Sequence, residues 1–187
     1  MYANISRFFS AKDLIYSWTS RTIRGRYQQS ALGWLWAIIQ PAASVAIFAF
    51  IFTLIVPVET GDTPYVIFSY VAMVPWTLFA SAITDMSDSL VQNMTLVTKI
   101  YFPREAIPLA MMLARLFDFG IAAILLVILL IYFQIPIFLL GLVYIPIILV
   151  IQLMLIAGLG LAFAAFNVFF RDIQPLLKLL IQILFYP

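Results

Sequence analysis

The 187-residue sequence contains no cysteine and no histidine, and only 10% of its residues are charged. The first two absences exclude disulfides, haem ligation, the usual zinc ligands and catalysis by Ser-His-Asp or Cys-His groups. A soluble domain carries about 25% charged residues, so the scarcity of charge also excludes a water-covered surface. The sequence also lacks a G-x-x-x-x-G-K-[ST] motif and therefore has no Walker-type nucleotide site. We expect no catalytic residue, no metal site and no cofactor in this chain.

Hydrophobic residues make up 65% of the chain, and three stretches carry no charge: residues 27–58, 63–84 and 119–170. Because about 20 apolar residues cross the hydrocarbon layer of a bilayer, these stretches predict membrane helices. The sequence predicts them at 34–56, 64–84, 107–133, 138–166 and 175–187, the last of them cut off while still apolar. The predicted fold class is an all-α polytopic membrane protein with about five transmembrane helices.

The basic residues predict the orientation of the chain. Nine of them fall in the N-terminal segment and in the two loops predicted on the same side of the membrane, whereas the opposite loops have only Glu59 and Asp62. Lysine and arginine resist translocation, so the N-terminus is predicted to be cytoplasmic. The formal net charge is only +2, which gives no basis for nucleic-acid binding.

Residues 10–30 are too polar to span a bilayer, yet their apolar residues recur at helical spacing. Ser10 and Asp13 fit a capping box at the start of such a helix. We expect an amphipathic helix in the cytoplasmic interface, with Arg21, Arg24 and Arg26 among the lipid headgroups. A topogenic anchor without a further role is the alternative.

Arg115 and Asp118 lie three residues apart within the third predicted span, hence on one helix face. A charge at that depth costs about 2.5–3.5 kcal/mol on insertion scales, so pairing is expected. Either a structural ion pair at this site holds two helices together, or Arg115 meets an anionic substrate near the inner mouth. Asp85 and Asp88 are predicted to end the second membrane helix.

Aromatic residues make up 16% of the chain, and glycines mark one predicted span. Trp36 and Trp76 fall near predicted span ends, where amphipathic rings favour the interface, but rings that face a path could stack on sugars. Gly158 and Gly160 are predicted to let another helix approach closely.

The second cytoplasmic loop contains aromatic and charged residues around a proline. Exposed aromatic clusters mark partner interfaces, although an anchor at headgroup level is the alternative. The residues concerned are Lys99, Tyr101, Phe102, Pro103, Arg104 and Glu105.

Three segments together resemble the membrane subunit of ABC-2 type polysaccharide exporters, which move O-antigen, capsule or teichoic acid. The first runs from Arg26-Tyr27 through Gly33-Trp-Leu-Trp36 to Gln40-Pro41. The second joins Val74-Pro75-Trp76 to the stretch Asn93–Pro108, and the third is Asn167-Val-Phe-Phe-Arg171-Asp172. The resemblance covers essentially the whole chain.

The resemblance implies a permease subunit in a bacterial inner membrane that works as a homodimer with two copies of a separate ATPase, which binds ATP and Mg²⁺. It implies that residues 10–30 and 93–105 contact the ATPase, together with a second connection at Asn167, Arg171 and Asp172. The implied substrate is a lipid-linked glycan, with Tyr27 near its headgroup and Arg115, Asp118, Trp36 and Trp76 along its path. Six membrane helices are implied, and the sixth is absent from this sequence.

Three alternatives remain open at this point. One is an ABC-2 permease for a small hydrophobic drug or a lipid. Another is a membrane enzyme that acts on lipid-linked sugars, for which Asp85 and Asp88 are the candidate acids. The last is a scaffold subunit that does not transport.

Overall fold

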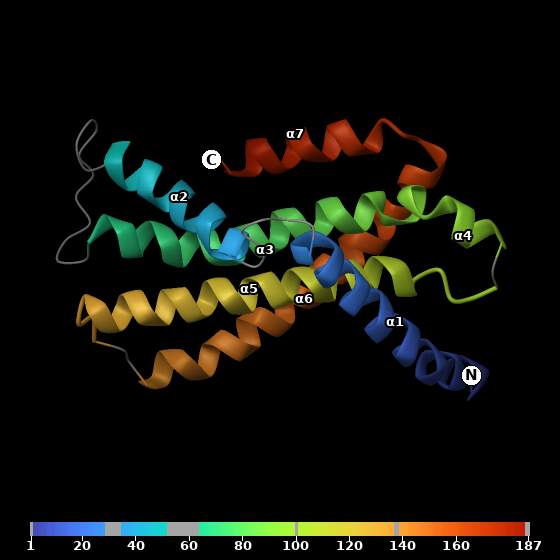
Figure 1. The fold of residues 1–187 in the computed structure, drawn as a ribbon, viewed down its shortest axis with the longest axis horizontal. Coiled ribbons are helices and arrows are strands. Elements are labelled where there is room, and N and C mark those ends of the chain that lie inside the picture. Colours follow the sequence, from blue (N-terminus) through green and yellow to red (C-terminus); the bar gives the residue numbers. More distant parts are fainter. Residues whose placement is uncertain (1, 29–34, 52–63, 100, 137–138, 186–187) are drawn as a thin grey trace.

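The computed structural model describes residues 2–28, 35–51, 64–99, 101–136 and 139–185. These residues form helices and contain no strand, so the predicted all-α membrane fold is confirmed (Figure 1). The helices are α1 (Tyr2–Gln28), α2 (Trp36–Phe50), α3 (Tyr65–Gln92), α4 (Met94–Lys99), α5 (Ala106–Tyr132), α6 (Leu139–Phe169) and α7 (Ile173–Phe185).

Three of the described helices are long and apolar enough to cross a membrane: α3, α5 and the part of α6 from Gly141 to Phe169. At about 1.5 Å per residue, each exceeds the ~30 Å of a hydrocarbon core. The described parts of α2 and α7 are shorter apolar helices. The predicted spans 34–56, 138–166 and 175–187 extend outside the described residues at positions 34, 52–56, 138 and 186–187, as do residues 29 and 30 of the predicted interface helix.

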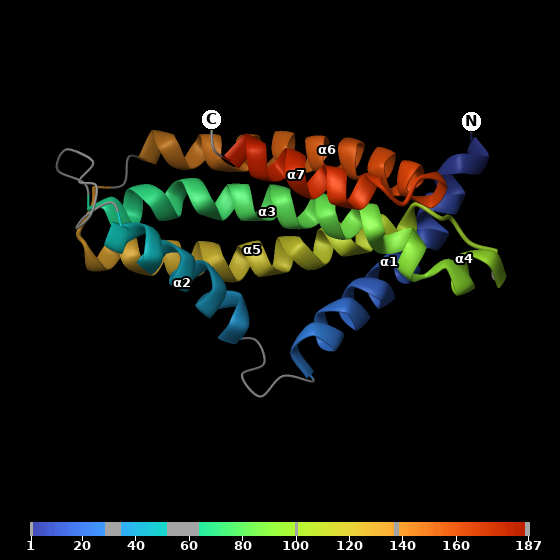
Figure 2. The ribbon, with the colours of Figure 1, turned by 90° about the horizontal axis from the view of Figure 1, so that it is seen from above.

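α3 lies at the centre of the bundle and packs against both α5 and α6, while α2 and α7 lie against its outer sides (Figures 1 and 2). Ala82, Ile83 and Met86 of α3 are fully buried in the core together with Ile156 of α6. A Cβ atom added at Gly160 would clash with the Sδ atom of Met86, whereas one at Gly158 would meet open space. Only Gly160 therefore allows the close helix approach that the sequence predicted for both glycines.

Two predicted helix ends are wrong. α1 begins at Tyr2 and continues through Ser10, so the capping box does not start it. α3 continues past Asp85 and Asp88 to Gln92, where Gln92 donates to Asp88 one turn back. Leaving the hydrocarbon does not break a helix, because its backbone hydrogen bonds persist in water and polar i,i+4 pairs support them.

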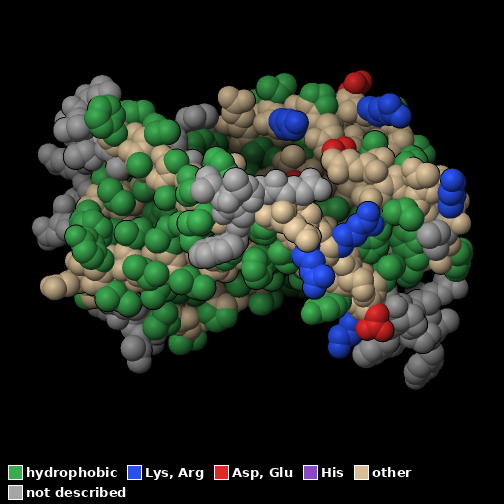
Figure 3. Space-filling model, in the orientation of Figure 1, with side chains coloured by type: hydrophobic (Ala, Val, Ile, Leu, Met, Phe, Trp, Pro, Cys, Tyr) green, Lys and Arg blue, Asp and Glu red, His purple; other side chains and the backbone are tan. Residues whose placement is uncertain are grey.

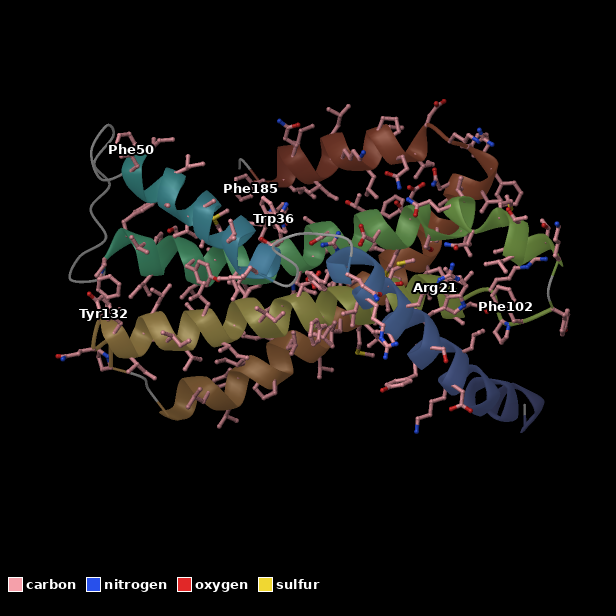
Figure 4. The ribbon with its side chains drawn as sticks, in the orientation of Figure 1. Arg21, Trp36, Phe50, Phe102, Tyr132 and Phe185 are labelled. Atoms are coloured by element: carbon pink, nitrogen blue, oxygen red, sulfur yellow. The ribbon has the colours of Figure 1, made fainter. Side chains whose placement is uncertain are left out.

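The charged side chains gather at one end of the molecule, where α1 and α4 lie, and hydrophobic side chains cover the other half of the visible face (Figure 3). Arg21 and Phe102 mark the charged end, and Phe50 and Tyr132 mark the opposite end (Figure 4). Large apolar side chains such as Ile124, Ile128 and Ile131 are exposed along α5. This distribution suits a bundle whose sides contact lipid and whose charged end contacts water.

Candidate functional site

One face of α1 lies on α5. The Thr19 hydroxyl donates to the carbonyl of Ile15 and lies 3.4 Å from the carbonyl of Ala110 on α5. One turn further on, the Thr22 hydroxyl lies 3.8 Å from the Sδ atom of Met111. Residues 19, 22 and 26 share this helix face, so the same packing carries Arg26 over α5.

Arg26 thereby joins a cluster of four charges from three helices. Its guanidinium bridges Asp85 of α3, at 2.5 Å, and Asp118 of α5, at 2.8 Å. Arg115 contacts the same two carboxylates: Nε and Nη2 lie 2.7 and 3.1 Å from the oxygens of Asp85, and Nη1 lies 3.4 Å from Asp118. We call Arg26, Asp85, Arg115 and Asp118 the charge cluster. Its four formal charges sum to zero.

The charge cluster is partly shielded from solvent, since its side chains are only 19–28% exposed. The Tyr27 hydroxyl donates a hydrogen bond to Asp118. Burial and the adjacent Asp118 carboxylate raise the pKa of the Tyr27 hydroxyl above its ordinary value. Tyr27 is therefore a neutral donor at physiological pH, and each arginine is already neutralised by two carboxylates.

A cavity of about 610 Å³ opens on one side of the charge cluster, between α1, α2, α3 and α5. In Figure 2 the end of α1 and the start of α2 approach each other at some distance from α3 and α5. Side chains from all four helices line the cavity. Its polar wall residues are Arg26, Arg115 and Asp118 of the charge cluster, Tyr27, Gln40, Thr77 and Ser81. The Trp36 ring and the apolar side chains of Met73, Val74, Leu78, Phe119 and Ala122 complete the wall. Trp36 is 46% exposed, so its ring is open to a ligand. An aromatic face among amides, hydroxyls and paired ions suits a sugar, which offers C–H surfaces and hydroxyls.

A second, smaller space of about 300 Å³ lies on the other side of the charge cluster. Residues 73–81 of α3 line the first cavity, whereas residues 84–92 line the second. Lys178 and Gln174 of α7 complete the second space, which we call the lower chamber. Arg26 and Arg115 line both spaces, so the charge cluster stands between them.

The structure brings together five of the residues that the sequence assigned to headgroup binding or to the substrate path. They are Arg26, Tyr27, Trp36, Arg115 and Asp118. Arg21 and Arg24 instead lie on the outer, exposed side of α1, where the Arg21 guanidinium lies 4.8 Å from the centroid of the Trp18 ring. Trp76 does not line the 610 Å³ cavity, because its ring packs against Phe79 and Phe185, with centroids 5.8 and 5.7 Å away.

Asp85 is the member of the charge cluster that sequence reasoning missed. The sequence predicted it to end the second membrane helix, but it pairs with Arg115 from a position 30 residues earlier. Arg115 within an apolar span was the available signal, because a charge at that depth requires an acid at the same level on a neighbouring helix.

The residues predicted to couple to an ATPase lie at the charged end of the molecule. Tyr101 is 94% exposed, Lys99, Arg104 and Glu105 are exposed, and Phe102 and Pro103 are half-buried. Arg171 and Asp172, between α6 and α7, are exposed at the same end (Figure 1).

The side chain of Asn167 does not face outward with them. It is 2% exposed, and its amide donates to the carbonyl of Ser87 at 3.0 Å. Because the Asn167 side chain is buried against α3, it holds α6 against α3 and cannot touch another subunit.

Among the residues that the structure describes, no three histidine, cysteine, aspartate or glutamate side chains are grouped as metal ligands. The site defined by these contacts is an opening inside a helical bundle, lined by paired charges, hydroxyls and apolar side chains.

Fold and site define a multi-pass helical membrane protein with a polar cavity among its spans. The chain matches the ABC-2 type transporter family over residues 13–186 and belongs to that family. The family resemblance seen in the sequence is thus confirmed.

Three curated relatives share the same printed name, O-antigen export system permease protein RfbA. Two from Klebsiella pneumoniae are 32% and 33% identical over 176 and 175 residues, which cover 93% of this chain and 66% of each relative. One from Myxococcus xanthus is 26% identical over 183 residues, or 97% of this chain and 69% of that relative. The chain therefore spans about two thirds of the length of these permeases.

Proposed function

We propose that this chain belongs to the membrane-spanning permease subunit of an ATP-driven exporter, which moves a lipid-linked polysaccharide across a bacterial inner membrane. The observation that carries the proposal is the similarity, over 93% of the chain, to proteins named as O-antigen export permeases. The exposed Trp36 ring and the Thr77 and Ser81 hydroxyls in the cavity wall support a sugar-containing substrate, because a sugar offers C–H surfaces to an aromatic ring and hydroxyls to polar groups.

The permease works as a homodimer with two copies of a separate ATPase, which holds ATP and Mg²⁺. ATP binding closes the ATPases, and the movement reaches the permease through the exposed loop at 99–105 and through α1. Pro103 suits this role, because it stiffens the loop just before α5 begins at Ala106. Arg171 and Asp172 supply the second contact from the same exposed end.

Recognition of the lipid headgroup rests on the outer face of α1. Arg21 and Arg24 are exposed on it, whereas Arg26 is engaged by two carboxylates. Each exposed arginine near an anionic surface contributes about 1 kcal/mol. The headgroup therefore meets Arg21 and Arg24 at the cytoplasmic surface, and Trp36 and its neighbours meet the sugars.

The proposal is tested by deleting the gene in its native host and locating the lipid-linked glycan. We expect the surface polysaccharide to disappear and full-length glycan on its lipid carrier to accumulate inside, with both restored by the full-length gene. Normal surface polysaccharide in the deletion strain would contradict the proposal. Export of small hydrophobic compounds or lipids would then be the function to examine.

A further inference from the structure

We propose that the charge cluster is a releasable latch: transport requires α1 to withdraw Arg26 from Asp85 and Asp118, which joins the 610 Å³ cavity to the lower chamber. The inference rests on the proposed function, and it makes Arg26 a positioning residue for transport. It is carried by three features of the described residues: how α1 is attached, which charges remain after release, and what stands on either side.

The ion pairs of Arg26 are the specific attachment of α1 at this level. The neighbouring contacts of α1 with α5 are weak, since Thr19 reaches Ala110 at 3.4 Å and Thr22 meets only a thioether at 3.8 Å. Arg26 by contrast makes bonds of 2.5 and 2.8 Å to two different helices. Withdrawing Arg26 therefore breaks both ion pairs that join α1 to α3 and α5, and Tyr27, the next residue of α1, leaves Asp118 in the same movement.

The remaining members of the charge cluster are arranged to stay paired after Arg26 leaves. Arg115 makes two bonds to Asp85 and a third to Asp118, so each carboxylate keeps a cationic partner when α1 moves. Arg115 belongs to α5 itself, so it cannot leave without moving a membrane span. Arg26 belongs to an amphipathic helix whose outer face is already exposed, so it has water and headgroups to move into.

The position of Arg26 makes its release consequential. Its side chain and that of Arg115 line both the cavity and the lower chamber, which otherwise take their α3 residues from successive turns. Moving Arg26 away removes one of the two side chains common to both walls. α1 is also a helix through which the movement of the ATPase is proposed to reach the permease. A movement of α1 thereby changes access to the cavity without rearranging α3, α5 and α6.

The absence of cysteine from the chain allows a direct test by cross-linking. Thr22→Cys with Met111→Cys would link α1 to α5 one turn before Arg26 and one turn before Arg115, where the two side chains already touch. In the full-length permease with its ATPase, we expect oxidation of this pair to lower glycan export at least tenfold, and reductant to restore it. Thr19→Cys with Ala110→Cys is a second pair on the same face, for use if the first is poorly expressed.

The matched control is a cross-link between helices that stay together. Met86→Cys with Gly160→Cys joins α3 to α6, where a Cβ at 160 lies 3.1 Å from that of Met86, close to the ~3.5–4.5 Å of a disulfide. We expect export by this oxidised variant to stay within twofold of its reduced form. Equal export by the oxidised and reduced α1–α5 variants would overturn the latch. Absence of glycan export from the reduced variants and the unsubstituted protein alike would instead overturn the proposed function.

A second measurement does not depend on transport. Val74→Cys places a thiol in the wall of the cavity, and Arg26→Gln removes the latch. In inside-out vesicles, we expect Arg26→Gln to raise the labelling rate of this thiol by a water-soluble maleimide at least fivefold. Lys12→Gln, an exposed position of α1 away from the charge cluster, is the control and should leave the rate unchanged. An unchanged rate with Arg26→Gln would mean that the charge cluster does not separate the two spaces.

Discussion

Gly158 and Gly160 stand two residues apart on α6, yet they meet different surroundings. Gly160 is buried against Met86 of α3, and Gly158 has nothing within 4 Å of an added Cβ. In a bilayer, small residues stabilise helix pairs by allowing close packing, so the two positions should respond differently to a large side chain.

We expect Gly160→Leu to destabilise the folded protein by about 1–3 kcal/mol, because the added atoms displace Met86 from a packed core. Gly158→Leu should change stability by less than about 0.5 kcal/mol. Thermal unfolding of the purified full-length variants in detergent measures the difference. Equal shifts at both positions would contradict the α3–α6 packing described above.

Two acids in the charged half of the bundle offer a second comparison. Asp118 accepts from Arg26, Arg115 and Tyr27, whereas Asp88 accepts from Gln92 within its own helix. Asp118→Asn should cost about 1–3 kcal/mol, between the values for surface and for buried ion pairs, because its side chain is 19% exposed. Asp88→Asn should cost less than about 0.5 kcal/mol. The same unfolding assay decides, and a larger loss at Asp88 would argue against the charge cluster.

At the scale of the elements, the sequence predicted the helices well and some of their ends poorly. Uncharged runs located α3, α5 and α6, because a helix in lipid must be both apolar and long. The same runs misplaced the end of α3, since hydropathy marks where the hydrocarbon ends and not where a helix ends. They also gave no sign that Asn167 faces inward, because a polar side chain at a span end suits either a loop contact or a bond to a neighbouring helix.

The loop between α4 and α5 carries a prediction about partners. Tyr101 is almost fully exposed beside Arg104, and these residue types dominate the binding energy of interfaces. Tyr101→Ala with Arg104→Glu should lower the amount of ATPase that copurifies with the full-length permease about tenfold, which corresponds to about 1.4 kcal/mol. Gln134→Ala, in the exposed turn after α5, is the control and should have no effect. Retention of the ATPase by the double variant would place the main contact elsewhere.

For the whole molecule, the distribution of charge predicts which end faces the cytoplasm. The basic loops and α1 share one end, and the turn after α5 lies at the other (Figures 1 and 3). Tyr101→Cys and Gln134→Cys place single thiols at these two ends of a chain that has none. In spheroplasts, an impermeant maleimide should label Gln134→Cys and spare Tyr101→Cys until the membrane is permeabilised. The reverse pattern would invert the proposed topology.

Part of the candidate site could also be predicted from the sequence. The spacing of Arg115 and Asp118 placed them on one helix face, and Trp36 was a candidate for the substrate path. The ion pair between Arg26 and Asp85 could not be predicted from the sequence, because it depends on how α1 crosses α5 and how α5 lies against α3. Such contacts follow from tertiary packing, which a single sequence does not encode at fixed spacings.

The order of the charge cluster along the chain has a consequence for biosynthesis. Arg26 and Asp85 leave the ribosome before α5 and sum to zero, and Arg115 and Asp118 then enter within one turn of each other and again sum to zero. The nascent chain therefore gains the residues of the charge cluster as two pairs, each of which has no net charge. Because α5 carries its own counter-ion, the translocon can release it into lipid before the bundle has closed around it.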